Sequence, residues 1–348
     1  MSTIDRRYDI DWMRVIAIAL LLIYHVAIGF QPWGMMIGFI TNNKSWEALW
    51  MPMNMLNIWR IPLLFYVSGM GVSFAMRNRN WKQLLWERGR RILVPFLCGM
   101  VLIVPLHIYI WQYYYQFAIS YSPGPGHLWF LGNLVAYVVI LSPIFFYLQR
   151  KEQGRFVAWM KRVFSHPLGM LVVVAAFVAE VSWLHPTPFE LYAVTWHGFF
   201  LGLLAFFFGF CFVLCGPAFW NMIFKWRWLF LAIAGTLFVN RAVYFQFHAP
   251  NEMLVVESNS WIISFFAFAY KFLNRPSKAL RYLSQAVYPI YILHMIFLYL
   301  GSYLIFPLNI DVHIQFFLVL LFTIVGCFLT YEVIIRRIKF IRPLFGLK

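Results

Sequence analysis

The chain has 348 residues, of which 63% are hydrophobic and only 11% are charged. Soluble domains carry about 25% charged residues, so this composition excludes a soluble globular protein and indicates a membrane protein. The formal net charge is +16, but the basic residues cluster in short segments between apolar runs, which argues against a nucleic-acid partner.

Ten apolar stretches are each close to the ~20 residues that cross a bilayer as a helix. We therefore expect an all-α integral membrane protein, a bundle of about ten transmembrane helices that forms a single domain over residues 1–348 with no separate soluble domain. In chain order, the expected spans are 12–31, 53–76, 92–112, 127–148, 167–184, 197–215, 228–246, 257–274, 284–304 and 313–334.

The distribution of Lys and Arg predicts the orientation of the bundle. Most of the 28 Lys and Arg residues lie near the N-terminus or in the segments 77–91, 150–162, 225–227, 275–281 and 336–348. Cytoplasmic loops of membrane proteins carry the excess of basic residues, so these segments are predicted to be cytoplasmic. With ten spans, both termini then lie in the cytoplasm.

The first span contains two ionisable side chains on one face. Arg14 and His25 are eleven positions apart, so they share a stripe of the helix about 16 Å long. Asp11 lies three residues before Arg14 and can pair with it. We expect His25 deep in the span as a neutral general base, and Arg14 as an anchor for an anionic ligand; an interhelical hydrogen bond and an interfacial ion pair are the structural alternatives.

Arg88 and Arg91 lead into the third span. Two guanidinium groups three residues apart on a helix point the same way and can grip phosphate groups. The alternative is ordinary cytoplasmic positive charge.

Two further arginines lie inside apolar stretches, Arg60 in the second span and Arg241 in the seventh. A buried arginine needs a partner, and structural ion pairs with Glu180, Glu252 or Glu257 are the favoured interpretation. The rival interpretation is that these arginines bind substrate or stabilise a developing oxyanion.

Three other side chains could contact a substrate. His127 and Trp129 begin the fourth span at the predicted outer surface, where an aromatic residue also fits an interfacial belt. His294 lies in the ninth span, five residues after Pro289, and a kink at that proline could open a ligand cavity. A core hydrogen bond is the alternative for His294.

We see no nucleotide-binding loop, no metal-ligand motif and no serine-hydrolase motif, so no metal site is expected.

With these residues assembled, the chain resembles the acyltransferase-3 family of bacterial integral-membrane O-acyltransferases. The resemblance rests on D-x-x-R-x10-H in the first span, the Ser-Gly pair at 68–69, R-x-x-R with a following proline at 88–95, HLWFL at 127–131 and YPIYILH at 288–294. It covers essentially the whole chain and is nearest to the branch that contains glucan-modifying succinyltransferases.

The resemblance implies a multi-pass acyltransferase domain in the bacterial inner membrane. Its reaction would move an acetyl or succinyl group from cytoplasmic acyl-CoA, a co-substrate rather than a bound cofactor, to a hydroxyl of an extracytoplasmic glycan or lipid-linked sugar. The resemblance maps the family's catalytic residues onto His25 and Arg14, and its cytoplasmic arginines onto Arg88 and Arg91.

Two questions stay open from the sequence. His25 could act as a general base for direct transfer or carry the acyl group as an acyl-imidazole. The alternative function is a proton-coupled secondary transporter that uses buried His, Arg and Glu residues, although no internal repeat between the two halves supports it.

Overall fold

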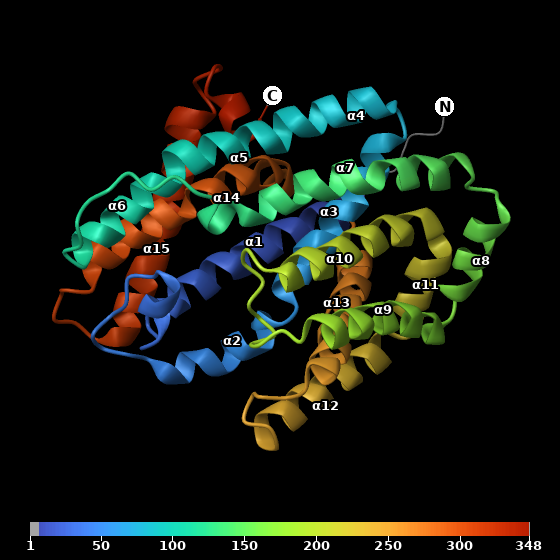
Figure 1. Ribbon diagram of the computed structural model, residues 1–348, viewed down its shortest axis with the longest axis horizontal. Coiled ribbons are helices and arrows are strands. Elements are labelled where there is room, and N and C mark those ends of the chain that lie inside the picture. The colour runs from blue at the N-terminus through green and yellow to red at the C-terminus, as the bar shows by residue number, and fades with distance from the viewer. Residues whose placement is uncertain (1–6, 348) are drawn as a thin grey trace. The chain divides into compact units, whose positions relative to one another are not determined.

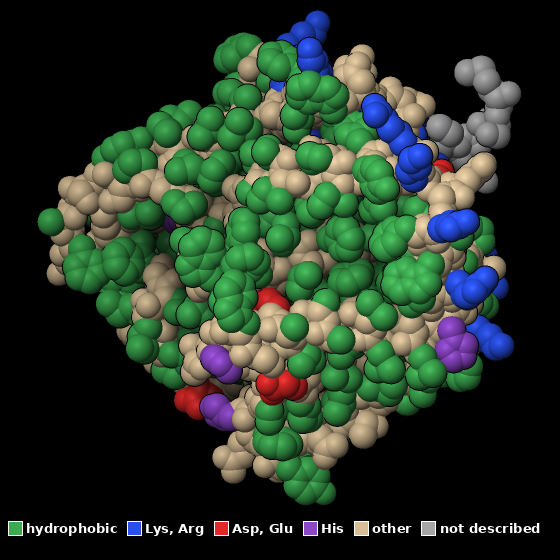
Figure 2. Space-filling view, turned by 45° about the vertical axis from the view of Figure 1, so that its right-hand side comes forward, with side chains coloured by type: hydrophobic (Ala, Val, Ile, Leu, Met, Phe, Trp, Pro, Cys, Tyr) green, Lys and Arg blue, Asp and Glu red, His purple; other side chains and the backbone are tan. Residues whose placement is uncertain are grey.

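The computed structural model describes residues 7–347, and every regular element in that range is a helix. Figure 1 shows these helices in chain order. Within the described range, nine helices are long and apolar enough to cross a membrane, or ten if one bent pair counts as a single span. The expected all-α class with about ten spans is confirmed. Hydrophobic side chains cover most of the face drawn in Figure 2, as a lipid-facing surface requires.

The chain forms two compact units, and we describe each by itself. Unit 1 comprises residues 1–17, 57–85 and 136–280, and unit 2 comprises residues 18–56, 86–135 and 281–348. Five helices contribute residues to both units: α1 (Tyr8–Ile28), α2 (Trp50–Asn57), α4 (Trp81–Arg88), α7 (Trp129–Arg150) and α14 (Lys278–Ile305).

Unit 1 is built around α3 and α10, which pack backbone against backbone. A Cβ at Gly69 would meet the main chain of Phe206, and a Cβ at Gly209 would meet the main chain of Tyr66. Small residues allow this close approach in membrane bundles. The elements that lie wholly within unit 1 are α3 (Arg60–Met76), α8 (Arg155–Val163), η6 (Pro167–Gly169), α9 (Met170–Leu184), α10 (Trp196–Cys215), α11 (Pro217–Lys225), α12 (Arg227–Val243) and α13 (Asn251–Phe272).

The seventh span differs from the sequence-based expectation of one helix at 228–246. Helices α11 and α12 bend by 60° at a short break, and together they pass the length and hydropathy test. Trp226 joins them with non-helical backbone angles. The predicted span therefore corresponds to the second arm of a broken helix.

Unit 2 contains the third, ninth and tenth spans and the segment after α1. Its elements are η1 (Gly34–Ile37), η2 (Glu47–Leu49), α2 (Trp50–Asn57), η3 (Gly89–Leu93), α5 (Val94–Cys98), η4 (Gly99–Ile103), α6 (Val104–Tyr114), η5 (Gly126–Leu128), α15 (Val312–Thr330), η7 (Tyr331–Ile335) and η8 (Arg342–Phe345). The last residue of α2, Asn57, belongs to unit 1.

The third span is one continuous helix, Trp81–Tyr114, with two widened turns. These π-helical turns are η3 and η4, and they lie just before Pro95 and Pro105. Proline has no N–H to donate, and π-turns are a recurrent way to accommodate such a gap, often near functional sites. The R-x-x-R pair therefore lies at the first of these turns.

Candidate active site

Four histidines from distant parts of the chain meet in unit 2, and we call them the histidine cluster: His25, His107, His127 and His294. They come from α1, α6, η5 and α14, respectively. The ring centroid of His294 lies 5.1 Å from that of His25 and 5.0 Å from that of His127, and His107 lies 5.3 Å from His127. His294 is fully buried and stands between His25 and His127.

Hydrogen bonds assign the protons of the central pair. Nδ1 of His294 lies 2.6 Å from the backbone oxygen of Tyr291, which can only accept, so this nitrogen carries the hydrogen. In a neutral ring Nε2 of His294 is then an acceptor, and it lies 2.9 Å from Nδ1 of His25. His25 therefore donates from Nδ1, and its Nε2 keeps the lone pair.

His127 and His107 also present nitrogen atoms that the protein does not use. Nε2 of His127 donates to the backbone oxygen of Ile292 at 3.1 Å, which leaves Nδ1 as an acceptor. That Nδ1, like Nδ1 of the buried His107, is inaccessible to solvent and has no hydrogen-bond partner among residues 7–347. Such unsatisfied buried atoms are costly, and they are typical of places where a substrate supplies the partner.

One face of α14 carries three side chains of the YPIYILH segment. Tyr288, Tyr291 and His294 follow one another at intervals of three residues, which spans about 9 Å along the helix. The hydroxyl of Tyr291 donates to the backbone oxygen of His127 at 2.6 Å. The hydroxyl of Tyr288 is buried and has no partner in the described chain.

The other end of this face lies beside the R-x-x-R segment. A Cβ at Gly346 would meet both the ring of Tyr288 and the backbone oxygen of Arg91, so these two residues flank the same glycine. Gly346 has a φ of 70°, which suits glycine. Arg91 is half exposed and pairs with Glu87 at 3.2 Å. Unit 2 thus holds Arg88, Arg91 and the histidine cluster together.

The comparison with protein families agrees with this arrangement. The acyltransferase 3 family, described as an acyltransferase domain, matches residues 7–332. The chain belongs to the acyltransferase-3 family. Neither the curated proteins nor the solved structures contain a match. Membership makes the protein a membrane acyltransferase, and this decides against the transporter that the sequence left open.

The ion pair expected at the start of α1 in this acyltransferase is confirmed. Nη1 of Arg14 lies 3.7 Å from Oδ1 of Asp11. Both residues belong to unit 1, whereas His25 lies at the other end of the same helix, in unit 2. The helix begins at Tyr8 rather than near residue 12, and His25 lies in its last turn. His25 is therefore near a helix end and half-buried, not deep in the span as expected.

The two buried arginines of the acyltransferase lie in unit 1. Arg241 donates from Nε and Nη2 to the two carboxylate oxygens of Glu257 at 2.8 and 2.9 Å, a buried bidentate pair. This is one of the structural ion pairs that the sequence favoured. Arg60 is buried at the start of α3. A substrate-binding role for Arg60 or Arg241 stays a prediction.

Another predicted partner, Glu180, has a different role. Its Oε1 lies 2.8 Å from Nδ1 of His197, whose Nε2 donates to the backbone oxygen of Phe189 at 2.9 Å. This contact joins α9, α10 and the loop between them.

The sequence-based interpretation missed His107. It is a lone histidine in an apolar run, VPLHIYIW, as is His25, but it has no charged residue at helical spacing to draw attention to it. Trp129 opens α7, as expected, next to His127 in the chain. Within residues 7–347 no group of three or more His, Cys, Asp or Glu is arranged to hold a metal ion.

Proposed function

We propose that this acyltransferase moves an acetyl or succinyl group from cytoplasmic acyl-CoA to a hydroxyl of an extracytoplasmic glycan or lipid-linked sugar in the bacterial inner membrane. Nε2 of His25 is the general base. The observation that carries the proposal is the hydrogen bond between His25 and His294, because it leaves that one nitrogen of His25 with its lone pair.

The chemistry follows from this proton assignment. Nε2 of His25 takes the proton of the acceptor hydroxyl while its oxygen attacks the thioester carbonyl. The tetrahedral intermediate collapses, the carbon–sulfur bond breaks, and the imidazolium returns the proton to the leaving thiolate, which yields the ester and free CoA. His294 accepts from Nδ1 of His25 throughout, and this holds the ring in one orientation.

The donor would enter at the basic end of unit 2. Arg88 and Arg91 supply guanidinium groups for the phosphates of CoA, which is the pairing that guanidinium geometry favours. Tyr288 and Tyr291 then lie between Arg91 and the histidine cluster, on the same helix as His294. Arg14 lies in unit 1, and its role as an anchor for an anionic group stays a prediction from the sequence.

The acceptor would approach the histidine cluster from the opposite end. His127 lies at the start of the fourth span, and its unpartnered Nδ1 can accept a hydrogen bond from a sugar hydroxyl. Trp129 lies in the next turn of the chain and offers an aromatic ring for the same acceptor.

The test uses purified protein in lipid nanodiscs. Acetyl-CoA and succinyl-CoA are supplied with the periplasmic and surface glycans of a strain that lacks the gene, and both thiol release and glycan mass are measured. We expect His25→Ala to lower the transfer rate by about 10²–10⁴-fold, the usual contribution of a general base.

The control is His313→Ala, because His313 is an exposed histidine of unit 2 outside the histidine cluster. Near-wild-type transfer by His25→Ala at equal protein amount would exclude His25 as the base. Intact-protein mass after donor alone distinguishes the two routes. An added acyl group on the wild type that His25→Ala lacks would replace direct transfer with an acyl-imidazole.

A further inference from the structure

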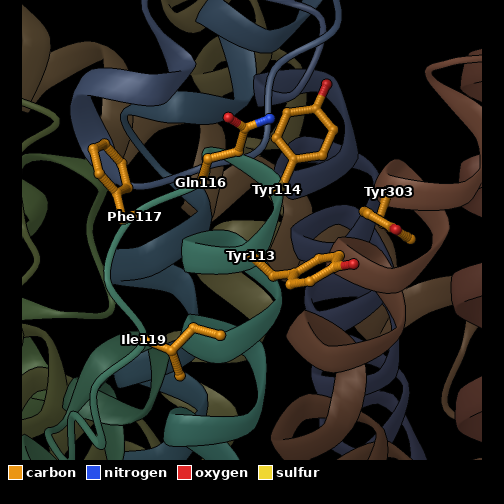
Figure 3. Close-up of a pocket in the computed structure, with 6 residues that line it drawn as sticks. All are labelled: Tyr113, Tyr114, Gln116, Phe117, Ile119 and Tyr303. Carbon is orange, nitrogen blue, oxygen red and sulfur yellow. The ribbon is translucent and has the colours of Figure 1, made fainter.

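A pocket of about 390 Å³ opens where α6 ends, and it is built entirely from unit 2. Figure 3 shows the side chains that line it, which come from the end of α6, the following loop and α14. These residues are Tyr113, Tyr114, Gln116, Phe117, Ile119 and Tyr303. Its volume is in the range of small-molecule sites.

The lining is aromatic and polar but carries no charge. The ring of Tyr303 lies 5.8 Å from that of Tyr113 and 6.3 Å from that of Tyr114. Tyr113 and Tyr303 contribute phenol hydroxyls to the lining, and Gln116 adds an amide. No Lys, Arg, Asp or Glu lines the pocket, so it does not suit the phosphates of CoA.

This chemistry matches a neutral sugar. The negative face of an aromatic ring attracts the C–H groups on the face of a pyranose, and phenol and amide groups bond its hydroxyls. A lipid chain, by contrast, would gain nothing from the free hydroxyls and the amide.

The helix ends in a way that keeps Gln116 in the pocket. The N–H of Gln116 bonds the oxygen of Tyr113 at 3.2 Å and the N–H of Phe117 bonds the oxygen of Gln112 at 2.9 Å, which is the Schellman pattern. Gln116 takes the left-handed position with a φ of 57°, where glycine is strongly preferred. The chain therefore holds a side chain there against its backbone preference, as strained functional positions do.

The loop that forms the lip of the pocket is fixed by a buried side chain. Both polar atoms of the Gln112 side-chain amide bond Ser120. Oε1 accepts from the backbone N–H and Nε2 donates to the hydroxyl, each at 3.1 Å. Residues 116–119 are thus held between two anchored points.

The pocket lies along the same two helices, α6 and α14, that carry His107 and His294 of the histidine cluster. His107 and Tyr114 are seven residues apart, so they share one face of α6 about 10 Å apart along the axis. His107 contacts Tyr299 with ring centroids 5.2 Å apart, and Tyr114 contacts Tyr303, one turn further along α14. The pocket includes the loop that joins the third and fourth spans. The basic segments 77–91 and 150–162 lie at the opposite ends of these two spans, so the positive charges predict that the pocket is extracytoplasmic.

We propose that this pocket binds a neutral sugar unit of the glycan acceptor and holds it while another hydroxyl of the same molecule reaches His25. The inference rests on the proposed function, and it names the chemistry of the acceptor and the residues that recognise it. The stacking residues are Tyr113 and Tyr303, and Gln116 supplies directional hydrogen bonds.

The test measures binding without catalysis, in the full-length His25→Gln protein in nanodiscs. The probe is an array of neutral gluco-, galacto- and manno-oligosaccharides, read by saturation-transfer NMR and titration. We expect at least one neutral series to bind. Tyr113→Ala and Tyr303→Ala should each weaken that binding by about three- to tenfold, and Tyr303→Phe should keep most of it.

Two further variants guard against misfolding. Gln116→Gly removes the amide while relieving the backbone, so we expect weaker binding from a protein that is at least as stable. Tyr109→Ala is the matched control, because Tyr109 is an exposed tyrosine of α6, 49% exposed against 54% for Tyr113, outside the pocket. We expect it to bind like the parent.

Three results would overturn the inference: no neutral oligosaccharide binds, the pocket variants bind as the parent does, or native mass spectrometry finds a phospholipid that Tyr113→Ala releases. These results differ from a failure of the proposed function, which would appear as full transfer activity without His25. Sugar binding by the His25→Gln protein would stand in that case.

Discussion

The two units differ in their buried polar contacts. In unit 1 two buried carboxylates contact basic side chains: both oxygens of Glu257 accept from Arg241, and Glu180 contacts His197. In unit 2 the polar centre is a set of imidazoles, and within the described chain Nδ1 of His107 and of His127 lack partners. The paired groups of unit 1 stabilise the fold, whereas the histidine cluster leaves nitrogen atoms available to a substrate.

The contrast also indicates which buried groups can exchange protons during a reaction. A buried guanidinium–carboxylate pair keeps its protons, because separating the two charges in a low-dielectric interior is unfavourable. A neutral imidazole has a lone pair that can accept a proton and later return it. Proton transfer is therefore expected from unit 2, whereas removal of the Arg241 charge should affect folding rather than proton transfer.

The largest expected effect tests the structural half of this contrast. Arg241→Ala leaves Glu257 as an unpaired buried carboxylate, so we expect a loss of about 3–5 kcal/mol in stability. Thermal unfolding in detergent, followed by size-exclusion fluorescence, measures it. Glu152→Gln removes a partner of the exposed Lys161–Glu152 pair in the same unit and should change stability by less than about 1 kcal/mol. Equal losses of stability in the two variants would show that the Arg241–Glu257 pair has no structural role.

The second prediction tests the functional half of the contrast, the role of the histidine cluster in transfer. His294→Ala removes the acceptor for Nδ1 of His25, so we expect transfer to fall by about ten- to hundredfold while the protein stays folded, as loss of an orienting partner usually does.

His294→Gln is the matched variant, since its amide oxygen can accept the same hydrogen bond. It should recover part of the rate. A purely structural role for His294 would instead lower protein abundance and leave the transfer rate per folded molecule unchanged in both variants.

The smallest effect concerns the strained end of α6. Gln116→Gly should raise the stability of the protein by about 1 kcal/mol, because glycine adopts the left-handed conformation without the cost that a side chain brings. A higher unfolding temperature together with weaker sugar binding is the expected combination. A lower unfolding temperature would show that the Gln116 side chain stabilises the fold.

Much of the helical framework follows from the sequence because apolar length and basic loops are local signals. The x10 spacing placed Arg14 and His25 on one helix, the three-residue spacing paired Asp11 with Arg14, and the carboxylates considered for Arg241 included Glu257. Helix α11 was missed, because the sequence analysis expected the seventh span at 228–246, close to α12, and assigned the basic residues at 225–227 to a loop before it.

The site was less predictable, because its contacts join positions that no local pattern relates. His25 and His294 are 269 residues apart in the chain, and only the packing of α1 against α14 brings their rings together. His107 carries no motif. The aromatic pocket depends on a helix end and a loop, where hydrophobic periodicity gives no signal.

One helix determines the spacing between the reacting base and the sugar pocket. Between His294 and Tyr303, α14 has nine steps of regular helix beyond the kink-prone Pro289, or about 14 Å. In the proposed reaction, the sugar unit bound by the tyrosines is therefore not the unit that reacts, and the distance along α14 would select which hydroxyl of the acceptor is acylated. A single-residue insertion in this stretch would rotate one position against the other by about 100° and redirect the ester to a different hydroxyl, or to none.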